Sequence, residues 1–252
     1  MIRSLDTVSH QFNVLQKKQE NMSTNIANVN TNGYKYQEFV QSTTETFQFG
    51  NNLNGPMLNQ QNPIEGLNFG NQIDAAYRNL TQGGLKGTSS ANDFALMGDA
   101  FFTVQMPNGE QAVTRNGNFT VDATGNLTTQ EGYLVLGRTQ TGQITTIPAG
   151  SVPFSVDQTG SINATGVRFL LTDNAEAENL QSIGDTLFAY QAGMTTDDDT
   201  LVLQTYLETS NVDMVDQMVQ MMQLTREFEA NQKMLHTSDE TLSKAVNEIG
   251  KV

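Results

Sequence analysis

The sequence contains no cysteine, no tryptophan and only two histidines among its 252 residues. Without cysteine no disulfide can form, so stability has to come from packing, and thiolate metal ligands and cysteine nucleophiles are excluded. His10 and His236 fall one in each terminal segment, and we expect both at a surface or interface rather than in catalysis. The sequence also lacks HExxH, CxxC, GxSxG and Walker A motifs.

Long apolar runs are also missing. Hydrophobic residues make up 37% of the chain, and the mean hydropathy is −0.40. Polar residues interrupt every turn of the N-terminal segment, so we expect no cleavable Sec signal there. No stretch approaches the length of a membrane span, so we expect no direct membrane insertion. Export would then need a route that reads no cleavable apolar signal.

Basic residues are scarce, with 13 Lys and Arg against 27 Asp and Glu and a net charge of −14. The imbalance is concentrated in residues 41–204, which carry a net charge of −11, whereas residues 1–40 carry +1 and residues 205–252 carry −4. Nucleic acid is therefore a poor partner. The near-neutral N-terminal segment and the acidic C-terminal segment are compatible with lateral pairing.

Acidic side chains offer few catalytic or metal-binding patterns. Asp197–Asp199 lacks the alternating spacing and the terminal bidentate glutamate of a calcium loop, so we interpret it as a solvated turn. Asp99 and Asp122 could form a carboxylate pair, but nothing in the sequence sets their separation. The residues therefore predict no catalytic, cofactor-binding or metal-binding site, and no enzyme.

The residues that are present are organised around the C-terminal stretch from Ser210 to Val252. It contains no proline, and Ser210 with Asp213 fits a capping box that would start a helix. A helix of about forty residues would be roughly 60 Å long. Asn231 and Ser238 interrupt its heptad seam as polar gaps. The apolar positions of this seam are Met221, Leu224, Phe228, Leu235, Leu242 and Ile249.

The N-terminal segment from Ile2 to Val29 repeats this heptad design, with Gln19 as its polar gap and a stop signal at Asn30–Gly33. The two seams could form an antiparallel pair within one chain. Alternatively, the two ends pair and then pack against copies of themselves. The apolar positions of the N-terminal seam are Leu5, Val8, Phe12, Leu15, Met22, Ile26 and Val29.

A methionine cluster near the start of the C-terminal helix is open to two interpretations. Flexible thioethers suit either a promiscuous groove or a soft interface that packs against slightly different neighbours. Because the cluster lies within a seam that has polar gaps, we favour the interface. Its members are Met214, Met218, Met221 and Met222.

Between the helices the pattern changes twice. Residues 41–70 keep no helical or strand period and are interpreted as a long linker or an irregular hairpin. Short strands separated by Asn-Gly and Thr-Gly turns then predict an antiparallel meander, sandwich or small barrel up to about Tyr190. The expected strands include Phe94–Met97 and Val152–Val156.

The whole chain is therefore predicted to be α+β: long N- and C-terminal helices forming a coiled-coil-like layer, a central antiparallel all-β domain and an extended arm. We expect residues 1–32 to be the N-terminal helix, 33–70 the arm, 71–203 the β domain and 204–252 the C-terminal helix.

Two end motifs resemble the signatures of bacterial flagellar rod and hook proteins. NIANVNTNGYK at Asn25–Lys35 resembles the N-terminal signature, and ETSNVD at Glu208–Asp213 the C-terminal one. Gly98–Val104 and Thr114–Phe119 are similar to the central β domain of the rod members. Thr24 departs from the pattern, which has asparagine there, and we expect it to be tolerated on a helix surface. The signature residues are Asn25, Ala27, Asn28, Thr31, Gly33, Lys35, Ser210, Asn211, Val212 and Asp213.

The resemblance implies a structural axial subunit of the flagellar basal body, exported unfolded by the flagellar type III apparatus. Its implied partners are further copies of itself, other rod and hook proteins and the export apparatus, with no cofactor and no nucleic acid. A chain with one β domain and an arm resembles the distal-rod type, and proximal-rod or hook-type paralogues are the alternative.

The seams suggest a physical mechanism for polymerisation. Each helix alone cannot bury its stripe, so we expect the termini to be mobile in the dilute monomer and helical in the polymer. Two readings from other classes remain: a cell-wall hydrolase that accompanies the rod, and a soluble binding module with an intramolecular coiled coil.

Overall fold

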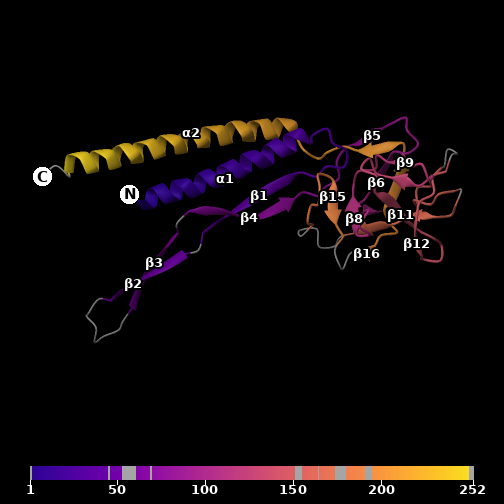
Figure 1. Ribbon diagram of the computed structural model, residues 1–252, viewed down its shortest axis with the longest axis horizontal. Helices are drawn as coiled ribbons and strands as arrows, with labels where there is room; N and C mark the ends of the chain where they lie inside the picture. Colours follow the sequence, from indigo (N-terminus) through magenta and orange to yellow (C-terminus); the bar gives the residue numbers. More distant parts are fainter. Residues whose placement is uncertain are drawn as a thin grey trace. The chain divides into compact units, whose positions relative to one another are not determined.

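The computed structural model shows an α+β chain, as the sequence predicts, with a helix near each end and antiparallel sheets between them (Figure 1). It describes residues 2–44, 46–52, 61–68, 70–150, 155–163, 165–173, 180–190 and 195–249. The chain divides into two compact units, and each is described separately. The first comprises Met1–Thr24, Glu38–Tyr77 and Val215–Val252, and the second comprises Asn25–Gln37 and Arg78–Met214.

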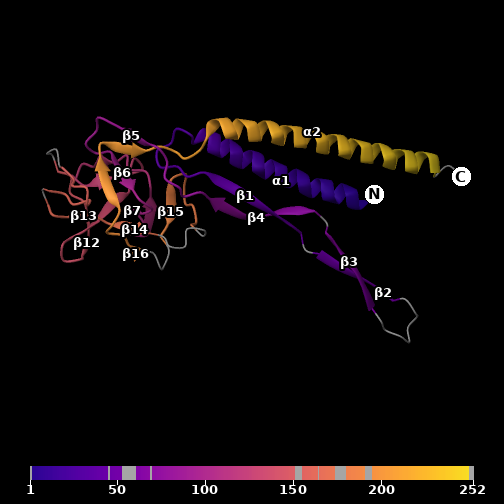
Figure 2. The same cartoon turned by 180° about the vertical axis from the view of Figure 1, so that it is seen from behind.

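Two long helices dominate the first unit. They are α1 (Ile2–Ala27) and α2 (Met214–Lys244), and α2 continues as a π-helix over Ala245–Ile249. Figures 1 and 2 show the two helices side by side. Within the described parts of the chain, no helix is both long and apolar enough to cross a membrane.

The start of α2 differs from the capping-box prediction. The helix begins at Met214 and not directly after Ser210. The Ser210 hydroxyl instead accepts a hydrogen bond of 3.3 Å from the backbone N–H of Val212, within the extended segment before the helix. The side chain that resembles an N-cap therefore bonds within the segment that leads into the helix.

Four strands complete the first unit. β1 (Gln37–Thr43) pairs with β4 (Asn71–Arg78), and β2 (Thr46–Asn52) pairs antiparallel with β3 (Gln61–Asn68). Residues 53–60 lie outside the described part. Of the two interpretations of residues 41–70, the described strands correspond to the irregular hairpin, since the register shifts between Phe47 and Phe49.

Helix α1 also contacts the segment that leads into β4. The Asn71 amide donates a hydrogen bond of 3.3 Å to Gln11 Oε1. Gly70 has φ +135°, and a Cβ at this position would lie 3.1 Å from the Cβ of His10. Glycine therefore permits the close approach of the backbone to the helix.

Antiparallel sheets make up the second unit. In the largest sheet, the strands follow the order β15-β8-β7-β11-β10-β9, with β12 and β13 paired to β11, and β14 paired to β7 and β16. Two smaller sheets pair β17 with β6 and β18 with β5. The strands are β5 (Leu85–Gly87), β6 (Phe94–Met97), β7 (Phe101–Gln105), β8 (Gln111–Thr114), β9 (Thr120–Val121), β10 (Leu127–Thr128), β11 (Leu134–Arg138), β12 (Ile144–Thr146), β13 (Arg168–Phe169), β14 (Leu171–Asp173), β15 (Leu187–Ala189), β16 (Thr195–Thr196), β17 (Leu201–Gln204) and β18 (Tyr206–Glu208).

The core of this unit consists of aromatic and branched side chains from these strands. Phe102 lies 5.2 Å from Phe119 and 5.5 Å from Phe169 between ring centroids, and all three are almost fully buried. Apolar and aromatic residues alternate with turn residues in this region, and this pattern predicted most of the strands. The strand expected at Val152–Val156 falls mostly outside the described residues.

Thr205 joins β17 to β18 with φ +65°, a left-handed conformation unusual for a β-branched residue. Its N–H donates to the carbonyl of Asp93 at 2.8 Å, and its carbonyl accepts from the N–H of Thr88 at 2.7 Å. Both backbone groups are therefore paired across the bend. This bend lets one continuous segment contribute β17 to one sheet and β18 to another.

Candidate functional site

The middle of the two heptad seams is packed within one chain. The rings of Phe12 and Phe228 meet edge to face, with centroids 4.5 Å apart and planes at 77°. Leu15 and Leu224 are both buried. Phe12 and Leu15 belong to the heptad seam on α1, and Leu224 and Phe228 belong to the seam on α2.

The outer positions of the same seams are not covered in this way. Leu5 is 39% exposed and Leu235 is 38% exposed. Val8, Met22, Ile26, Val29, Met221 and Leu242 are half-buried, and the side chain of Ile249 lies outside the described part. A single chain therefore buries the centre of the two stripes and leaves apolar surface towards their ends.

The N-terminal signature folds back on itself where α1 ends, within the second unit. The fully buried Asn25 donates from its amide to the carbonyl of Gln37 at 2.8 Å. Its Oδ1 accepts from the Tyr34 hydroxyl at 3.0 Å and from the N–H of Gln37 at 3.2 Å. One side chain in the last turn of α1 thus holds the far end of the loop that follows the helix.

Gly33 is required at its position for two reasons. Its φ is +70°, and a Cβ there would lie 2.4 Å from the backbone nitrogen of Asn116. Its N–H also donates to the carbonyl of Glu208 at 2.8 Å. The residue therefore brings the N-terminal signature against the β domain and the C-terminal signature at the same point.

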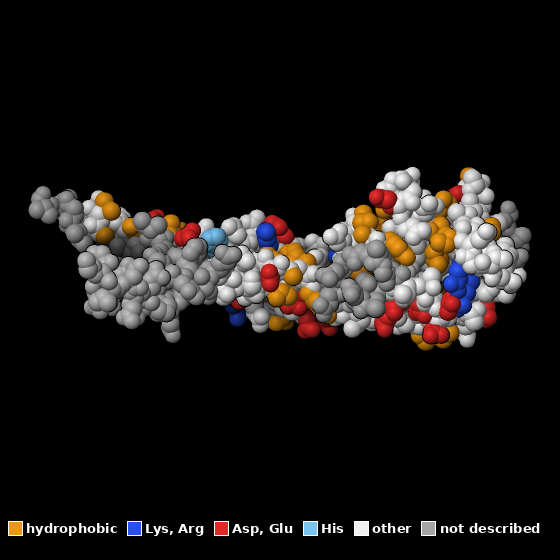
Figure 3. Space-filling view, turned by 90° about the horizontal axis from the view of Figure 1, so that it is seen from below, with side chains coloured by type: hydrophobic (Ala, Val, Ile, Leu, Met, Phe, Trp, Pro, Cys, Tyr) orange, Lys and Arg blue, Asp and Glu red, His pale blue; other side chains and the backbone are white. Residues whose placement is uncertain are grey.

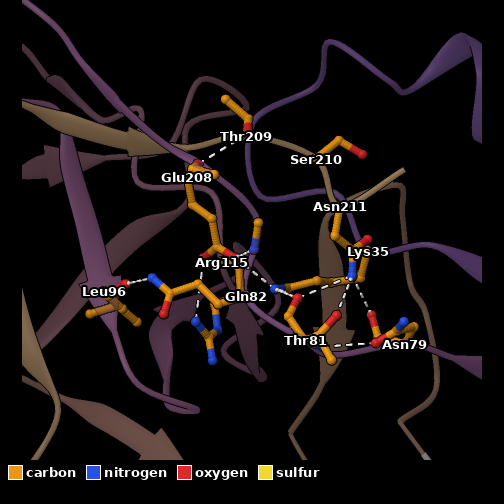
Figure 4. A network of polar contacts seen from close by, with 12 residues as sticks. Lys35, Asn79, Thr81, Gln82, Leu96, Arg115, Glu208, Thr209, Ser210 and Asn211 are labelled. Atoms are coloured by element: carbon orange, nitrogen blue, oxygen red, sulfur yellow. Dashed lines mark hydrogen bonds and ion pairs between the residues drawn. The ribbon is translucent and has the colours of Figure 1, made fainter. Parts of the chain in front are cut away.

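Glu208 is the centre of a buried ionic network (Figure 4). Its Oε1 lies 2.6 Å from Lys35 Nζ, and its Oε2 lies 3.3 Å from Arg115 Nη1. The backbone N–H of Gly83 donates to Oε1 at 2.9 Å, and Lys35 also donates to the carbonyl of Thr81 at 2.8 Å. The three charged side chains are at most 1% exposed.

This network places two cations beside one carboxylate, away from water. Burial lowers the pKa of Lys35 below 10.5; the carboxylate of Glu208 opposes this shift, and the guanidinium of Arg115 adds to it. Burial likewise lowers the pKa of Arg115. Within the described structure, Arg115 Nε and Nη2 have no hydrogen-bond partner, and its guanidinium carbon lies 4.8 Å from the centre of the Phe101 ring.

Asn211 extends the same junction towards α2. Its Oδ1 accepts from the N–H of Tyr36 at 2.7 Å, and its amide donates to the carbonyls of Asn79 and Thr81 at 2.9 and 3.0 Å. Val212, the next residue, is buried. The two signatures therefore meet through side chains that bond to backbone groups.

The remaining signature residues lie around this centre. Thr31 donates to Asn28 Oδ1 at 2.9 Å, within the loop after α1. Ala27 and Asp213 are exposed, at the end of α1 and just before α2. Thr24 lies exposed on α1, as expected, and its hydroxyl donates to the carbonyl of Glu20 at 3.0 Å.

Sequence reasoning did not identify the ionic partners. Glu208 and Arg115 lie inside motifs that the resemblance singled out, but neither was proposed as part of a site. The signal available was a lone charge at the end of a short strand: Glu208 is the last residue of β18, and Arg115 directly follows β8. Such a charge predicts a buried pair only if the partner is known, and nothing in the spacing connects Lys35 to either residue.

Charged side chains that the sequence brought up as weak candidates lie at the surface. His10 and His236 are exposed beside Asp6 and Glu240, each one helical turn away. In the acidic turn, Asp198 accepts from Arg138 at 2.8 Å and from Arg168 at 3.2 Å. Figure 3 shows acidic side chains spread over the face it draws, with basic side chains in a few small groups.

Comparison with known proteins identifies two matching family models. Residues 95–164 match the D1 domain of the flagellar hook protein FlgE/F/G, and residues 203–248 match the C-terminal domain of the flagellar basal body rod FlgEFG proteins. The first covers the centre of the β unit, and the second covers the strand before α2 together with α2.

Full-length relatives show the same similarity. The chain is 30% identical to the flagellar basal-body rod protein FlgG of Buchnera aphidicola (subsp. Schizaphis graminum), over 91% of this chain and 94% of the relative. It is 31% identical to FlgG of Agrobacterium fabrum, over 96% and 97%. It is also 30% identical to the rod protein FlgF of Rhizobium meliloti, over 94% and 93%.

Proposed function

Because this chain belongs to the flagellar basal-body rod family, we propose that it polymerises through its terminal helices into the distal part of the rod. As a member of this family it is a structural subunit of the flagellar basal body and not an enzyme. Its proposed partners are copies of itself, other rod and hook proteins and the flagellar type III export apparatus.

The observation that carries the polymerisation proposal is the uneven cover of the seams. Leu15 and Leu224 are buried at the centre, whereas Leu5 and Leu235 remain more than a third exposed towards the ends. Burying one large apolar side chain contributes about 1.5–3 kcal/mol. Further copies that cover these ends would form a coiled-coil layer, with the seam residues of both helices as the interface.

Hydrogen exchange tests this proposal directly. We expect weak protection of residues 5–29 in dilute protein and strong protection after assembly, because the apolar ends need neighbouring copies. Strong protection of these residues in a monomer that ignores added protein would contradict the proposal. It would instead support a soluble module with an intramolecular coiled coil.

The arm, residues 33–70, is proposed to brace adjacent subunits. β2 and β3 pair with each other in a two-stranded sheet, and an isolated two-stranded hairpin is marginally stable in water. Contact with a neighbouring copy would stabilise it. Deleting residues 41–70 should reduce the bending stiffness of the polymer, and unchanged stiffness and assembly would exclude this role.

The distal position is the finer part of the proposal. It rests on the presence of one β domain and an arm, and a proximal-rod or hook-type paralogue is the alternative. A cross-linking map of assembled basal bodies distinguishes the two, because it identifies the axial neighbours of this chain.

A further inference from the structure

Asn-Gly dipeptides are sites at which a protein backbone can attack one of its own side chains. The backbone nitrogen of the glycine reaches the amide carbon of the asparagine, because glycine has no Cβ that obstructs the approach. The chain has four such dipeptides, at Asn32–Gly33, Asn54–Gly55, Asn108–Gly109 and Asn116–Gly117. Asn54–Gly55 lies outside the described residues, and the other three differ in their surroundings.

Asn108–Gly109 lies at the exposed tip of the hairpin between β7 and β8. The N–H of Gly109 donates to the carbonyl of Met106 at 2.9 Å, which closes a tight turn. Gly109 has φ +86°, and a Cβ at this position would meet nothing within 4 Å. The turn can therefore open by exchanging one hydrogen bond for a bond to water, with no packed neighbour in its way.

The side chain of Asn108 is folded back along the chain past Gly109. Its Oδ1 accepts from the N–H of Glu110 at 3.0 Å, and its Nδ2 donates to Glu110 Oε2 at 2.6 Å. A bond from Oδ1 to the N–H two residues on is an Asx turn, which directs the amide towards the peptide nitrogen between them. The same N–H also polarises the carbonyl that this nitrogen would attack.

Asn116–Gly117 is a matched site with the same side-chain bond but a covered backbone. Asn116 Oδ1 accepts from the N–H of Asn118 at 3.1 Å, so it also forms an Asx turn. Gly117 is buried, however, and a Cβ there would collide with the carbonyl oxygen of Phe94. The carbonyl of Gly117 also accepts from the N–H of Phe94 at 3.0 Å. The neighbouring strand β6 therefore holds this peptide in place.

Asn32–Gly33 is covered in a different way. The N–H of Gly33 donates to the carbonyl of Glu208 at 2.8 Å within the buried junction. This N–H would have to lose its proton before the nitrogen could attack. A Cβ on Gly33 would collide with the backbone of Asn116, so the peptide lies against the β domain. Rotation of this peptide requires the junction to open locally.

We propose that Asn108 is a site of spontaneous deamidation, and that the fold protects Asn32 and Asn116 from the same reaction. Base removes the proton from the nitrogen of Gly109, and this nitrogen attacks Cγ of Asn108. A C–N bond forms, the bond from Cγ to Nδ2 breaks, and the leaving group takes up a proton and departs as ammonia. Water then opens the cyclic imide at either carbonyl carbon, which gives aspartate or isoaspartate. The reaction requires no partner chain, so it is independent of the proposed assembly.

Both products change the tip of the hairpin. The new carboxylate faces Glu110, so a hydrogen bond is replaced by repulsion between like charges. Isoaspartate also lengthens the backbone by one carbon between the two bonds of the turn, from Gly109 to Met106 and from Met106 to Glu110. The ladder of β7 and β8 begins below the tip, at Gln105 and Gln111, and we expect it to keep its register.

Peptide mapping of the dilute natural protein in mildly alkaline buffer tests the proposal. In the folded protein, Asn108 should lose its amide at least about tenfold faster than Asn116 or Asn32, because those sites must first open locally. Both aspartate and isoaspartate should form at position 108. In concentrated urea the fold covers none of the three sites, so their rates should converge.

Retention of the Asn108 amide, or an equal rate at Asn116 in the folded protein, would overturn the proposal. A lead of the same size for Asn108 in urea would assign the selectivity to neighbouring residues in the sequence, and the protective role of the fold would be wrong. Aspartate without isoaspartate would indicate direct hydrolysis of the side chain, which excludes attack by the backbone nitrogen.

The variants Gly109→Ala and Gly132→Ala provide a matched pair. The two glycines are exposed, with φ +86° and +87°, and a Cβ at either would meet nothing within 4 Å. Alanine at position 109 obstructs the attacking nitrogen and should slow the conversion of Asn108 about tenfold. Gly132→Ala carries a similar backbone strain and should leave the rate unchanged. Equal rates in the two variants would exclude the nitrogen of residue 109 as the nucleophile.

Discussion

Lys35 Nζ lies 2.6 Å from Glu208 Oε1, although 173 residues separate them in the chain. One residue belongs to the signature after α1, and the other to the signature before α2. Their pairing is intramolecular, and so are the bonds of Gly33 and Asn211 around it. At these positions the two signatures form a junction within the second unit. Along the sequence, α1 ends within the first signature and α2 begins directly after the second.

Removing the carboxylate of this junction should cost far more than removing a surface carboxylate. Glu208→Gln leaves Lys35 and Arg115 buried without a counter-ion, and we expect a loss of about 3–5 kcal/mol in the free energy of unfolding. Asp198→Asn breaks two ion pairs at a half-exposed carboxylate and should cost less than about 1 kcal/mol. Urea unfolding of both variants measures the difference, and equal losses would refute a buried network.

The junction should also make stability depend on pH. The pKa of Lys35 is lowered below 10.5, mainly by burial, so the unfolded chain binds more protons in the interval between the two pKa values. The free energy of unfolding should therefore rise with pH through this interval. Burial raises the pKa of Tyr34 above 10.0, which opposes the rise only at higher pH.

The variant Lys35→Met isolates this contribution. It lacks the titrating group, so the rise below pH 10.0 should be missing when urea unfolding is repeated across the same pH range. A rise of the same size in the variant would assign the effect to other groups.

Gly33→Ala should be more harmful than an alanine at another left-handed glycine. At Gly132, φ is +87° and a Cβ would meet nothing within 4 Å, so Gly132→Ala reports the cost of backbone conformation alone, about 1–2 kcal/mol. At Gly33 a Cβ would also collide with the backbone of Asn116, which adds about 1–3 kcal/mol. Thermal unfolding of the two variants tests this order, and an equal loss would exclude the collision.

The aromatic pair between the helices should show measurable coupling. A double-mutant cycle of Phe12→Ala and Phe228→Ala in assembled protein should give a coupling energy of about 0.5–1.5 kcal/mol, since the rings meet edge to face. A cycle of Phe12→Ala with Met234→Ala is the control and should give a value near zero. Denaturant unfolding of the polymers provides the energies, and zero coupling in the first cycle would mean that assembly separates the rings.

Much of the architecture follows from periodicity. Heptad spacing predicted both helices, and Asn-Gly and Thr-Gly turns predicted strands such as Phe94–Met97, whose bounds match β6. For residues 41–70 the sequence left a linker and an irregular hairpin open, because β2 and β3 are rich in Gln, Asn and Gly. Their few apolar residues keep a strand period over only a few positions, so the pattern could not select the antiparallel pairing that the structure shows.

The ionic junction could not be predicted for a different reason. Periodicity reports which residues are buried near each other in sequence, whereas Lys35, Arg115 and Glu208 come from three distant segments. The prediction that Ser210 caps the C-terminal helix is wrong. A serine hydroxyl can accept a hydrogen bond from the N–H two residues later both at a helix start and outside a helix, as Ser210 does. Only the fold decides between these two uses.

The pairing of β17 and β18 has a consequence for synthesis on the ribosome. β5 and β6 emerge early, yet their partners come more than a hundred residues later: Gln204 bonds to Ala91 across 113 residues, and Thr209 bonds to Gly84 across 125. Until then their edges stay unpaired, and closing such long loops is slow. The nascent chain therefore cannot complete either of these two sheets until residues 201–208 have left the ribosome.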